Sequence, residues 1–298
     1  MAEDAPTDRP ARARSTPHRR NRAEQADRGQ RKSPRGDRRA ARPGPKRAHR
    51  ADADHYIYGL HATAFALRNP ARAIHAVWAT ENAERKLAEA LAGRALAVER
   101  STPRDLDKRV GSDTVHQGVV LEVAPLATHP LADLTERAAE SGQPLVILDQ
   151  VTDPHNVGAV LRSCAVFGAA GLVMTQRHSP PLGGTLAKAA SGALDLVAIA
   201  LVQNLAKTLT ELSGQSFAVI GLDGDPGHAM LADGLAARHS RPVALALGAE
   251  GRGLRERTRE LCSELCRIGG DGPITSLNVS NAAAIALHLA AMQRQQRA

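Results

Sequence analysis

Three short stretches hold the residues whose types and spacing best suit chemistry. They read N-V-G-A-V-L-R at 156–162, G-A-E-G-R-G at 248–253 and S-L-N-V-S at 276–280. The asparagines of the first and third stretches can each donate and accept hydrogen bonds, so they can fix neighbouring loops and a ligand's hydroxyl groups. The glycines on either side of Glu250 suit tight approaches of the backbone. The first two stretches are therefore predicted to converge on the third.

The third stretch lies within a longer segment, 268–289, that changes character along its length. It begins as a loop broken by glycine and proline and continues as an Ala-rich apolar helix, predicted over 276–290, with no charged side chain until Arg294. A helix that is apolar on all sides is normally buried. Its first turn offers free N–H groups and the positive end of the helix dipole to whatever the preceding loop encloses.

Elements that could position these stretches follow a strand–helix rhythm. Near-continuous apolar runs, typical of strands buried on both faces of a parallel sheet, stand at 145–149, 171–175, 196–201, 217–222 and 243–248. Helical patterns lie between them, at 156–167, 185–194 and 204–213. This alternation predicts an α/β fold with helices on both faces of the sheet.

The amino-terminal part of the chain divides into a tail and a small domain. Residues 1–53 contain no Ile, Leu, Val, Phe, Trp or Tyr and are rich in arginine, so we expect a disordered basic tail able to attract phosphates. Strand and helix patterns alternate over 54–124 and predict a compact α/β domain. A linker punctuated by Pro and Gly, 125–143, contains a short helical pattern at 131–139, and the larger domain begins at 144.

The three stretches, in this order, resemble the motifs N-x-G-A-x-x-R, G-x-E-G-x-G and S-L-N-V-S of the SpoU/TrmH RNA 2′-O-methyltransferases, a family of the SPOUT superfamily. Each motif alone is weak, but three in order are a strong signal. The resemblance implies a trefoil knot formed by roughly 245 to the C-terminus. It also implies that 54–124 is an L30e-like RNA-binding domain, in which His61 and His116 are candidates for RNA contact or for structural roles at element ends.

The resemblance implies S-adenosylmethionine as the cofactor. Methyl transfer to a ribose hydroxyl is an in-line displacement, which requires a bent donor held in a close-fitting pocket and a well-placed hydroxyl. By resemblance the cofactor contacts are Gly248, Ile268 and Leu277, mainly through their main chain, with Glu250 and Gly251 close by. One departure stands beside this site: Gly269-Gly270 replaces the family's usual Pro-Met and leaves the backbone looser.

The residues matching the family's functional positions are Asn156, Arg162, Glu250, Ser276 and Asn278. In family proposals the arginine is a base, but a guanidinium with a pKa above about 12 is a poor one. We therefore expect Arg162 to bind phosphate or to stabilise negative charge on the oxygen, with Glu250 pairing with it.

The two-domain layout favours ribosomal RNA, and the overall resemblance is to enzymes that methylate a guanosine of 23S rRNA. Alternatives are a transfer-RNA or adenosine-directed enzyme, or a non-catalytic RNA-binding ribosome-assembly protein. The resemblance also implies a homodimer. A nicotinamide-binding Rossmann enzyme is excluded because no G-x-G-x-x-G follows the first core strand.

Apolar runs and cysteine usage indicate the cellular compartment of the protein. The sequence shows no apolar run of transmembrane length and no signal peptide, and its cysteine count is odd, so we expect a reducing, cytoplasmic location. The C-x-x-x-C at 262–266 lacks a second pair of ligands, so we expect no metal site there. The two thiols are interpreted as lying near one helix face or its end.

Overall fold

The structure, a computed structural model, describes residues 55–238, 240–270, 272 and 274–296. The predicted basic tail at 1–53 lies outside the described residues. Among the described residues, no helix is long and apolar enough to cross a membrane.

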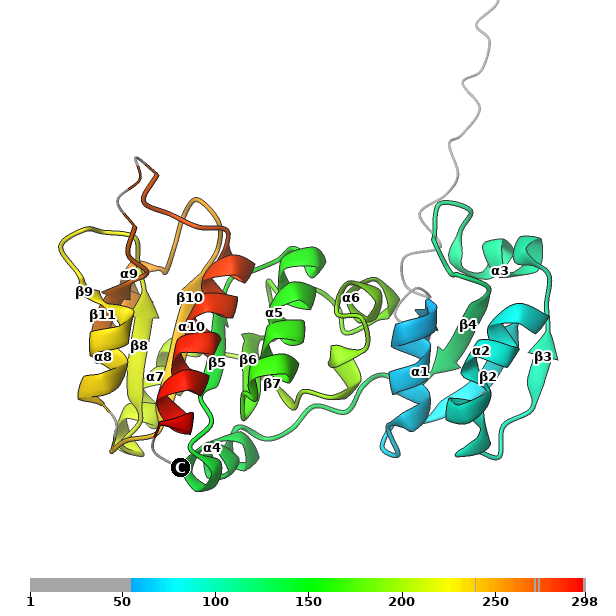
Figure 1. The fold of residues 1–298 in the computed structure, drawn as a ribbon, viewed down its shortest axis with the longest axis horizontal. Coiled ribbons are helices and arrows are strands. Elements are labelled where there is room, and N and C mark those ends of the chain that lie inside the picture. Colours follow the sequence, from blue (N-terminus) through cyan, green and yellow to red (C-terminus); the bar gives the residue numbers. More distant parts are fainter. Residues whose placement is uncertain (1–54, 239, 271, 273, 297–298) are drawn as a thin grey trace, which may run out of the picture. The chain divides into compact units, whose positions relative to one another are not determined.

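The larger domain is built on a parallel sheet of strand order β7-β6-β5-β10-β8-β11-β9 (Figure 1). Its strands are β5 (Leu145–Asp149), β6 (Gly171–Thr175), β7 (Ile199–Val202), β8 (Ala218–Leu222), β9 (Ala229–Met230), β10 (Val243–Gly248) and β11 (Glu264–Arg267). The predicted α/β class is confirmed. β9 and β11 were not predicted, because they are short strands without an apolar run.

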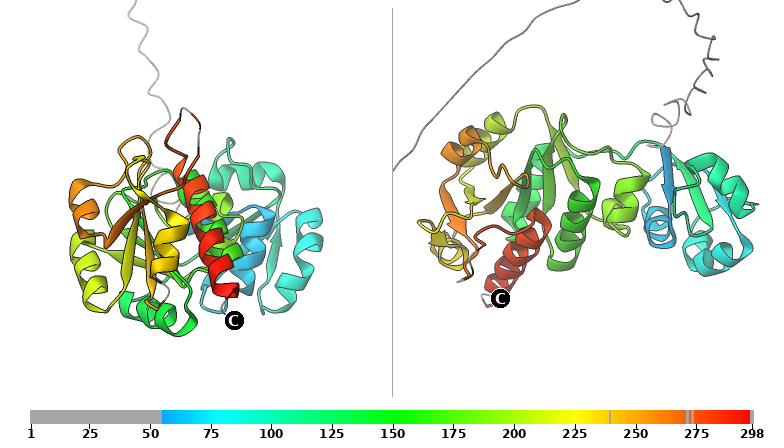
Figure 2. Two further views of the ribbon diagram at one scale, coloured as in Figure 1. Left: turned by 60° about the vertical axis from the view of Figure 1, so that its left-hand side comes forward. Right: turned by 90° about the horizontal axis from the view of Figure 1, so that it is seen from above.

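Side chains of the central strands alternate between two cores, as the two-residue repeat of a strand requires. Val146 and Leu148 of β5 pack on one face, where α5 (Pro154–Phe167), α8 (Leu231–Ala237) and α10 (Val279–Gln295) lie. Leu145 and Ile147 pack on the other face, with α4 (Leu131–Ser141), α7 (Leu205–Gly214) and α9 (Glu256–Leu261). The right-hand view of Figure 2 shows α10 and α9 on opposite sides of the strands. Helices therefore cover both faces, as predicted.

The predicted helix at 185–194 is broken in the structure. It divides into α6 (Gly184–Ala189) and the 3-10 helix η3 (Ala193–Asp195). Between them Ser191 and Gly192 take φ angles of 51° and 95°, which an α-helix cannot accommodate. A Cβ atom at Gly192 would lie 2.2 Å from the Phe65 ring, so close packing requires glycine here. The predicted strand at 196–201 correspondingly starts later, at Ile199.

The smaller sheet has the order β1-β4-β2-β3. Its strands are β1 (Tyr56–Tyr58), β2 (Ile74–Ala79), β3 (Val98–Arg100) and β4 (Val119–Val123), and its helices are α1 (Leu60–Arg68), α2 (Glu81–Ala92) and α3 (Pro103–Val110). Thr102 caps α3 and Pro103 stands in its first turn, as the sequence predicts.

The two histidines singled out in the small domain differ in exposure. His116 is buried, accepts the Gly118 N–H at Nδ1 over 3.0 Å, and places Nε2 3.2 Å from Asp107 Oδ1. These contacts favour the structural alternative for His116. His61 is exposed on α1 and stays a candidate for RNA contact.

A buried ion pair joins Arg72, in the segment before β2, to Asp195 of η3. Arg72 places Nε 2.8 Å from Asp195 Oδ1 and Nη2 3.1 Å from Oδ2. Asn69 Nδ2 donates to the same Oδ1 over 3.0 Å. The side chains of Arg72 and Asp195 are 1% and 0% exposed. No motif in the sequence pointed to this pair.

Helix α10 is not buried all round, so that expectation is wrong for the single chain. Ala283, Ala286 and Leu287 face the core, whereas Ile285 and Met292 are 37% and 43% exposed. The helix also starts at Val279 rather than 276, because Asn278 caps it by accepting the Ser280 N–H over 2.8 Å. Helix α10 packs against α5 and leaves an apolar strip uncovered.

Of the two cysteines predicted to lie near one helix face or its end, only Cys262 does so. Cys262 ends α9, but Cys266 lies on β11 and is fully buried. Burial raises the pKa of Cys262 to about 12 and that of Cys266 to about 11, so both thiols stay protonated near neutral pH.

Candidate functional site

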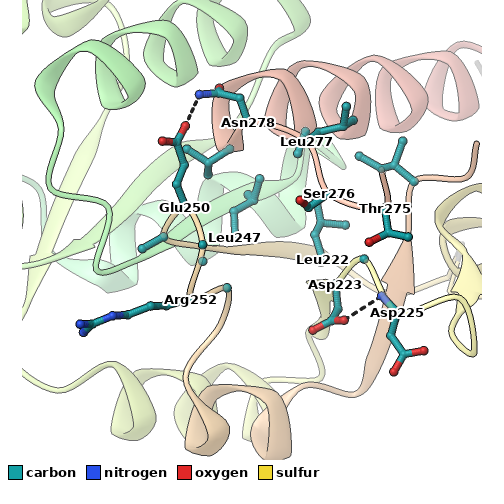
Figure 3. Close-up of a pocket in the computed structure, with 18 of the residues that line it drawn as sticks. Leu222, Asp223, Asp225, Leu247, Glu250, Arg252, Thr275, Ser276, Leu277 and Asn278 are labelled. Carbon is teal, nitrogen blue, oxygen red and sulfur yellow. Dashed lines mark hydrogen bonds between the residues drawn. The ribbon is translucent and has the colours of Figure 1, made fainter. Parts of the chain in front are cut away.

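The three predicted stretches meet at one edge of the large sheet. Parallel strands end at the same edge, and β5 and β10 are direct neighbours there, with Asp149 beside Gly248. A cavity of about 810 Å³ opens beyond this edge, a volume within the usual range for small-molecule sites (Figure 3). Its lining comes from the ends of β8, β10 and β11, the segments that follow them, one residue of α9, and the start of α10: Leu222, Asp223, Gly224, Asp225, Pro226, Leu247, Gly248, Ala249, Glu250, Gly251, Arg252, Gly253, Arg259, Ile268, Thr275, Ser276, Leu277, Asn278, Val279 and Ala282.

A hydrogen-bond network links the three stretches at one end of the cavity. Asn156 Nδ2 donates to Glu250 Oε1 over 3.2 Å, and Asn278 Nδ2 donates to Asn156 Oδ1 over 3.0 Å. Asn278 Nδ2 also donates to Glu250 Oε1, and Figure 3 shows these two side chains pointing toward each other. Because Asn278 Oδ1 caps α10, its amide nitrogen must face Glu250. The helix cap thus orients the network.

Glu250 keeps one carboxylate oxygen for a ligand. In the described part of the chain, only its Oε1 atom takes part in hydrogen bonds, and the residue is exposed to solvent at the cavity. A carboxylate oxygen can accept further hydrogen bonds. The free Oε2 atom therefore provides a fixed, negatively charged acceptor where the cavity opens.

The turn after β10 depends on its glycines. A Cβ atom at Gly248 would lie 2.0 Å from the carbonyl carbon of Gly253, and Gly251 and Gly253 have φ angles of 75° and 65°. The Gly253 N–H donates to Ala249 O over 2.8 Å and closes the turn. Because these conformations favour glycine, the turn exposes main-chain groups toward the cavity.

The clamp that holds this turn was not predicted. Asp149 at the end of β5 is buried and accepts from Arg255 Nε over 2.7 Å, from the Arg255 N–H over 3.1 Å and from Thr258 Oγ1 over 2.7 Å. Arg255 comes two residues after Gly253, so this carboxylate fixes the exit of the segment that carries Glu250. An aspartate at the end of an apolar strand, Asp149, is the sequence feature that could have predicted this clamp.

The opposite end of the cavity is polar and was also missed. Asp223, which follows β8, has a side chain that is 13% exposed, and it accepts from Arg259 and from the Asp225 N–H over 3.0 Å. A Cβ atom at Gly224 would lie 2.6 Å from Thr275 O, so the loop packs against the entry to α10. The run G-L-D-G-D after an apolar strand could have revealed this end of the cavity.

Most of the predicted site residues line the cavity. The predicted cofactor contacts Gly248, Glu250, Gly251, Ile268 and Leu277 are all part of its wall. So are the predicted catalytic residues Ser276 and Asn278, while Asn156 reaches the site through its hydrogen bonds.

Arg162 does not join them. It is exposed on α5 and, among the described residues, makes no hydrogen bond or ion pair. The expected pairing of Glu250 with Arg162 is therefore absent from the structure, because the carboxylate faces the two asparagines instead.

The unusual Gly269 is closely packed. A Cβ atom there would lie 2.3 Å from Met230 Cε, at the end of a flexible side chain. The neighbouring Ile268 lines the cavity and packs against the core, so the glycine pair does not remove this residue from the site.

Both domains match known families. Residues 143–288 match the SpoU rRNA Methylase family, and residues 56–129 match the family described as RNA 2′-O ribose methyltransferase substrate binding. The chain is 35% identical over 243 residues to the 23S rRNA (guanosine-2′-O-)-methyltransferase RlmB of Escherichia coli K12, covering 80% of this chain and 98% of that one. It is likewise 35% identical over 246 residues to RlmB of Pseudomonas aeruginosa, covering 80% and 96%.

Solved structures agree on the fold. The SpoU methyltransferase AviRb from Streptomyces viridochromogenes, in complex with the cofactor AdoMet, superposes with a TM-score of 0.68 at 21% identity, covering 84% of this chain and 95% of that one. An rRNA methyltransferase from Sinorhizobium meliloti gives a TM-score of 0.66 at 22% identity, covering 83% and 91%. Together with the sequence identity to the RlmB enzymes, the shared fold leads to one conclusion: the chain belongs to the SpoU rRNA methylase family.

Proposed function

We propose that this protein transfers a methyl group from S-adenosylmethionine to the 2′-hydroxyl of a guanosine in 23S rRNA. The observation that carries the proposal is the Asn156–Glu250–Asn278 network at one end of a cofactor-sized cavity. The RlmB relatives, which are named for this reaction, support the choice of substrate.

The cavity fits the proposed cofactor. Leu222, Leu247 and Leu277 supply apolar walls for an adenine ring, and the glycine turn at 248–253 supplies main-chain donors and acceptors. When bound, the cofactor supplies an electrophilic methyl group on a positively charged sulfur. Asp223 and the exposed Asp225 provide polar groups at the other end of the cavity.

The residues of the network have separate roles in this proposal. Glu250 Oε2 accepts the hydrogen bond of the ribose hydroxyl, orients its oxygen toward the methyl group and takes up the proton that the hydroxyl loses when its oxygen is methylated. Asn156 and Asn278 hold the Glu250 carboxylate in place, and Ser276 lies beside them on the cavity wall. Arg162, which is exposed, is proposed to contact an RNA phosphate or negative charge developing on the oxygen.

A methyl-transfer assay tests the reaction. RNA from cells that lack this protein is incubated with the protein and labelled cofactor, and the modified ribose is mapped. We expect one 2′-O-methylated guanosine in 23S rRNA. Methylation of an adenosine or of transfer RNA would replace the substrate part of the proposal. Cofactor binding without transfer to any RNA would favour a non-catalytic ribosome-assembly protein.

The substitution Gly248→Ala tests whether the turn after β10 forms the cofactor site. Its methyl group would overlap Gly253, so the turn must open and the main-chain contacts move. We expect cofactor affinity to fall by at least about tenfold. Isothermal titration calorimetry measures the affinity, and circular dichroism checks the fold. The matched control is Gly214→Ala, where the added Cβ meets nothing within 4 Å; equal affinities in both variants would contradict the assignment.

A homodimer is part of the proposal. Val166 of α5 is 75% exposed, Ile285 and Met292 of α10 are 37% and 43% exposed, and the two helices pack together. A second copy covering these side chains would remove the apolar strip from water. Arg162 lies one turn from Val166 on α5, so it would border this interface.

The substitution Ile285→Arg tests the dimer. Placing a charge within an apolar interface is expected to convert dimers into monomers, because the charge would lose its hydration. Analytical ultracentrifugation at several concentrations measures the mass. The control is Ile274→Arg, at an 81% exposed position ahead of α10. A wild-type monomer, or a dimer unchanged by Ile285→Arg, would refute this interface.

The remaining parts of the proposal concern architecture and setting. We propose that the segment from about 245 onward forms a trefoil knot, and that 54–124 is an L30e-like RNA-binding domain joined by the linker 125–143. Helix α4, within that linker, packs Leu134 and Ala138 into the core of the large domain. A cytoplasmic location, where ribosomal RNA is made, follows from the proposed substrate.

A further inference from the structure

Arg252 occupies a constrained position beside the cavity. It stands between Gly251 and Gly253, both with positive φ angles, in the turn closed by the hydrogen bond from the Gly253 N–H to Ala249 O. The turn is held at its exit by the Asp149–Arg255 contacts. The backbone that carries Arg252 therefore has little freedom, and the side chain starts two residues from Glu250.

The guanidinium of Arg252 is unpaired, unlike those that follow it. Arg255 pairs with Asp149, Arg257 with Glu260, and Arg259 with Asp223. In the part of the chain that the structure describes, Arg252 makes no hydrogen bond or ion pair, although it is exposed and lines the cavity. Its positive charge is therefore the one in this segment that remains available to a ligand.

The side chains of Glu250 and Arg252 point in different directions. Figure 3 shows Glu250 directed toward Asn278, and Arg252 extending from the turn away from Asp223 and Asp225 at the far end of the cavity. Arg252 also extends away from Asn278, so an anion held by its guanidinium would lie outside the cavity's apolar part, beside the turn that carries Glu250 two residues earlier. A guanidinium fork matches the geometry of a phosphate with two parallel hydrogen bonds.

We propose that Arg252 is a positioning residue that holds the phosphodiester on the 3′ side of the methylated ribose. In RNA the 2′-hydroxyl stands on the carbon next to the one bearing the 3′-phosphodiester. A ribose whose hydroxyl contacts Glu250 therefore brings that phosphate to the same end of the site. The contact reads no base and fixes the ribose for methyl transfer. The inference rests on the proposed function, because it requires RNA as the substrate.

The test compares Arg252→Ala and Arg252→Lys with the wild type in RNA binding and in methyl transfer. The matched control is Arg257→Ala, which removes an exposed guanidinium already paired with Glu260. For Arg252→Ala we expect an RNA Kd raised about tenfold, the effect of losing one charge-assisted contact. The slope of log K against log salt should become less negative by about 0.7 to 0.9. Arg252→Lys should keep the salt slope and recover only part of the affinity.

A chemically modified substrate locates the phosphate. An RNA fragment carrying a neutral methylphosphonate only at the linkage 3′ of the methylated ribose should bind wild-type protein about tenfold more weakly. The same modification should not weaken binding to Arg252→Ala further, because the contact is already lost. A methylphosphonate at the 5′ linkage serves as the control. If the 3′ methylphosphonate weakens RNA binding by Arg252→Ala as much as it weakens binding by the wild type, the proposal is overturned.

Other outcomes are equally decisive. A cofactor Kd raised in Arg252→Ala, with RNA binding unchanged, would assign Arg252 to the cofactor's carboxylate and overturn the inference. If Arg252→Ala binds RNA with unchanged affinity and salt slope, and the wild-type protein methylates the same RNA, the phosphate-binding role of Arg252 is refuted but the proposed function is not. A wild-type protein that methylates no RNA would refute the proposed function and this inference together.

Discussion

Replacing Glu250 by Gln is expected to lower the rate of methyl transfer by at least about 100-fold. Glutamine has the same shape and can still accept from Asn156 and Asn278 through its Oε1 atom. Its second position, however, becomes an uncharged NH₂ donor, so the free acceptor proposed for the ribose hydroxyl is lost. Cofactor affinity should fall less than the rate, because the glycine turn and the apolar wall of the cavity are unaffected. Single-turnover kinetics at saturating RNA and cofactor measure the rate.

The matched control for this substitution is Glu256→Gln. Glu256 is an exposed carboxylate at the first turn of α9, on the same segment as the glycine turn but outside the cavity lining. Its variant should retain the wild-type rate. A Glu250→Gln protein that transfers methyl groups within about threefold of wild type would show that the Oε2 acceptor is not required.

The substitution Arg72→Met is expected to have the largest effect on stability. It leaves the fully buried Asp195 carboxylate without its guanidinium partner, and breaking a buried pair in this way typically costs about 3–5 kcal/mol. Asn69 still donates one hydrogen bond but carries no charge. Urea denaturation, followed by circular dichroism, measures the free energy of unfolding.

Two further variants separate the loss of the pair from other effects. The double variant Arg72→Met with Asp195→Leu removes both charges, so it should recover most of the lost stability. The control Arg68→Met breaks an exposed pair with Glu89, whose side chains are 49% and 89% exposed, and should cost less than about 1 kcal/mol. A double variant as unstable as Arg72→Met would show that packing, rather than the unpaired charge, sets the cost.

The buried pair between Arg72 and Asp195 connects a segment of the small domain to a segment of the large domain. Arg72 lies in the segment between α1 and β2 of the small sheet, and Asp195 ends η3, in the segment that leads to β7 of the large sheet. Each buried charge is neutralised only when the segment that carries its partner is in position. Weakening the pair should therefore loosen the contact between these segments before it disturbs the hydrogen-bond network at Glu250.

The sequence by itself determined the features that depend on neighbouring residues. The apolar runs at 145–149, 171–175 and 243–248 became strands with the predicted bounds, because uninterrupted apolar residues of this length suit a sheet buried on both faces. The Thr102-Pro103 start of α3 was equally readable, since capping and the fixed φ of proline act within one turn. The three motifs identified the family for the same reason: they are short and continuous.

Helix breaks and buried faces were decided by the tertiary structure. The predicted helix at 185–194 runs through Ser191 and Gly192, and the break falls there because both residues have positive φ angles and Gly192 packs closely against Phe65. The composition of α10 likewise does not distinguish the face packed on α5 from the exposed face with Ile285, because both are apolar. Which face is covered depends on neighbouring elements.

The site itself was only partly readable from the sequence. Asn156 and Asn278 are separated by 122 positions, and they meet because β10 lies next to β5 and α10 packs on α5. The same arrangement turns Glu250 toward the asparagines and leaves Arg162 outside on α5. Local sequence determined which side chains are available, since backbone preference and capping act over a few residues. Their partners depended on strand order and helix packing, which bring together segments that no local pattern connects.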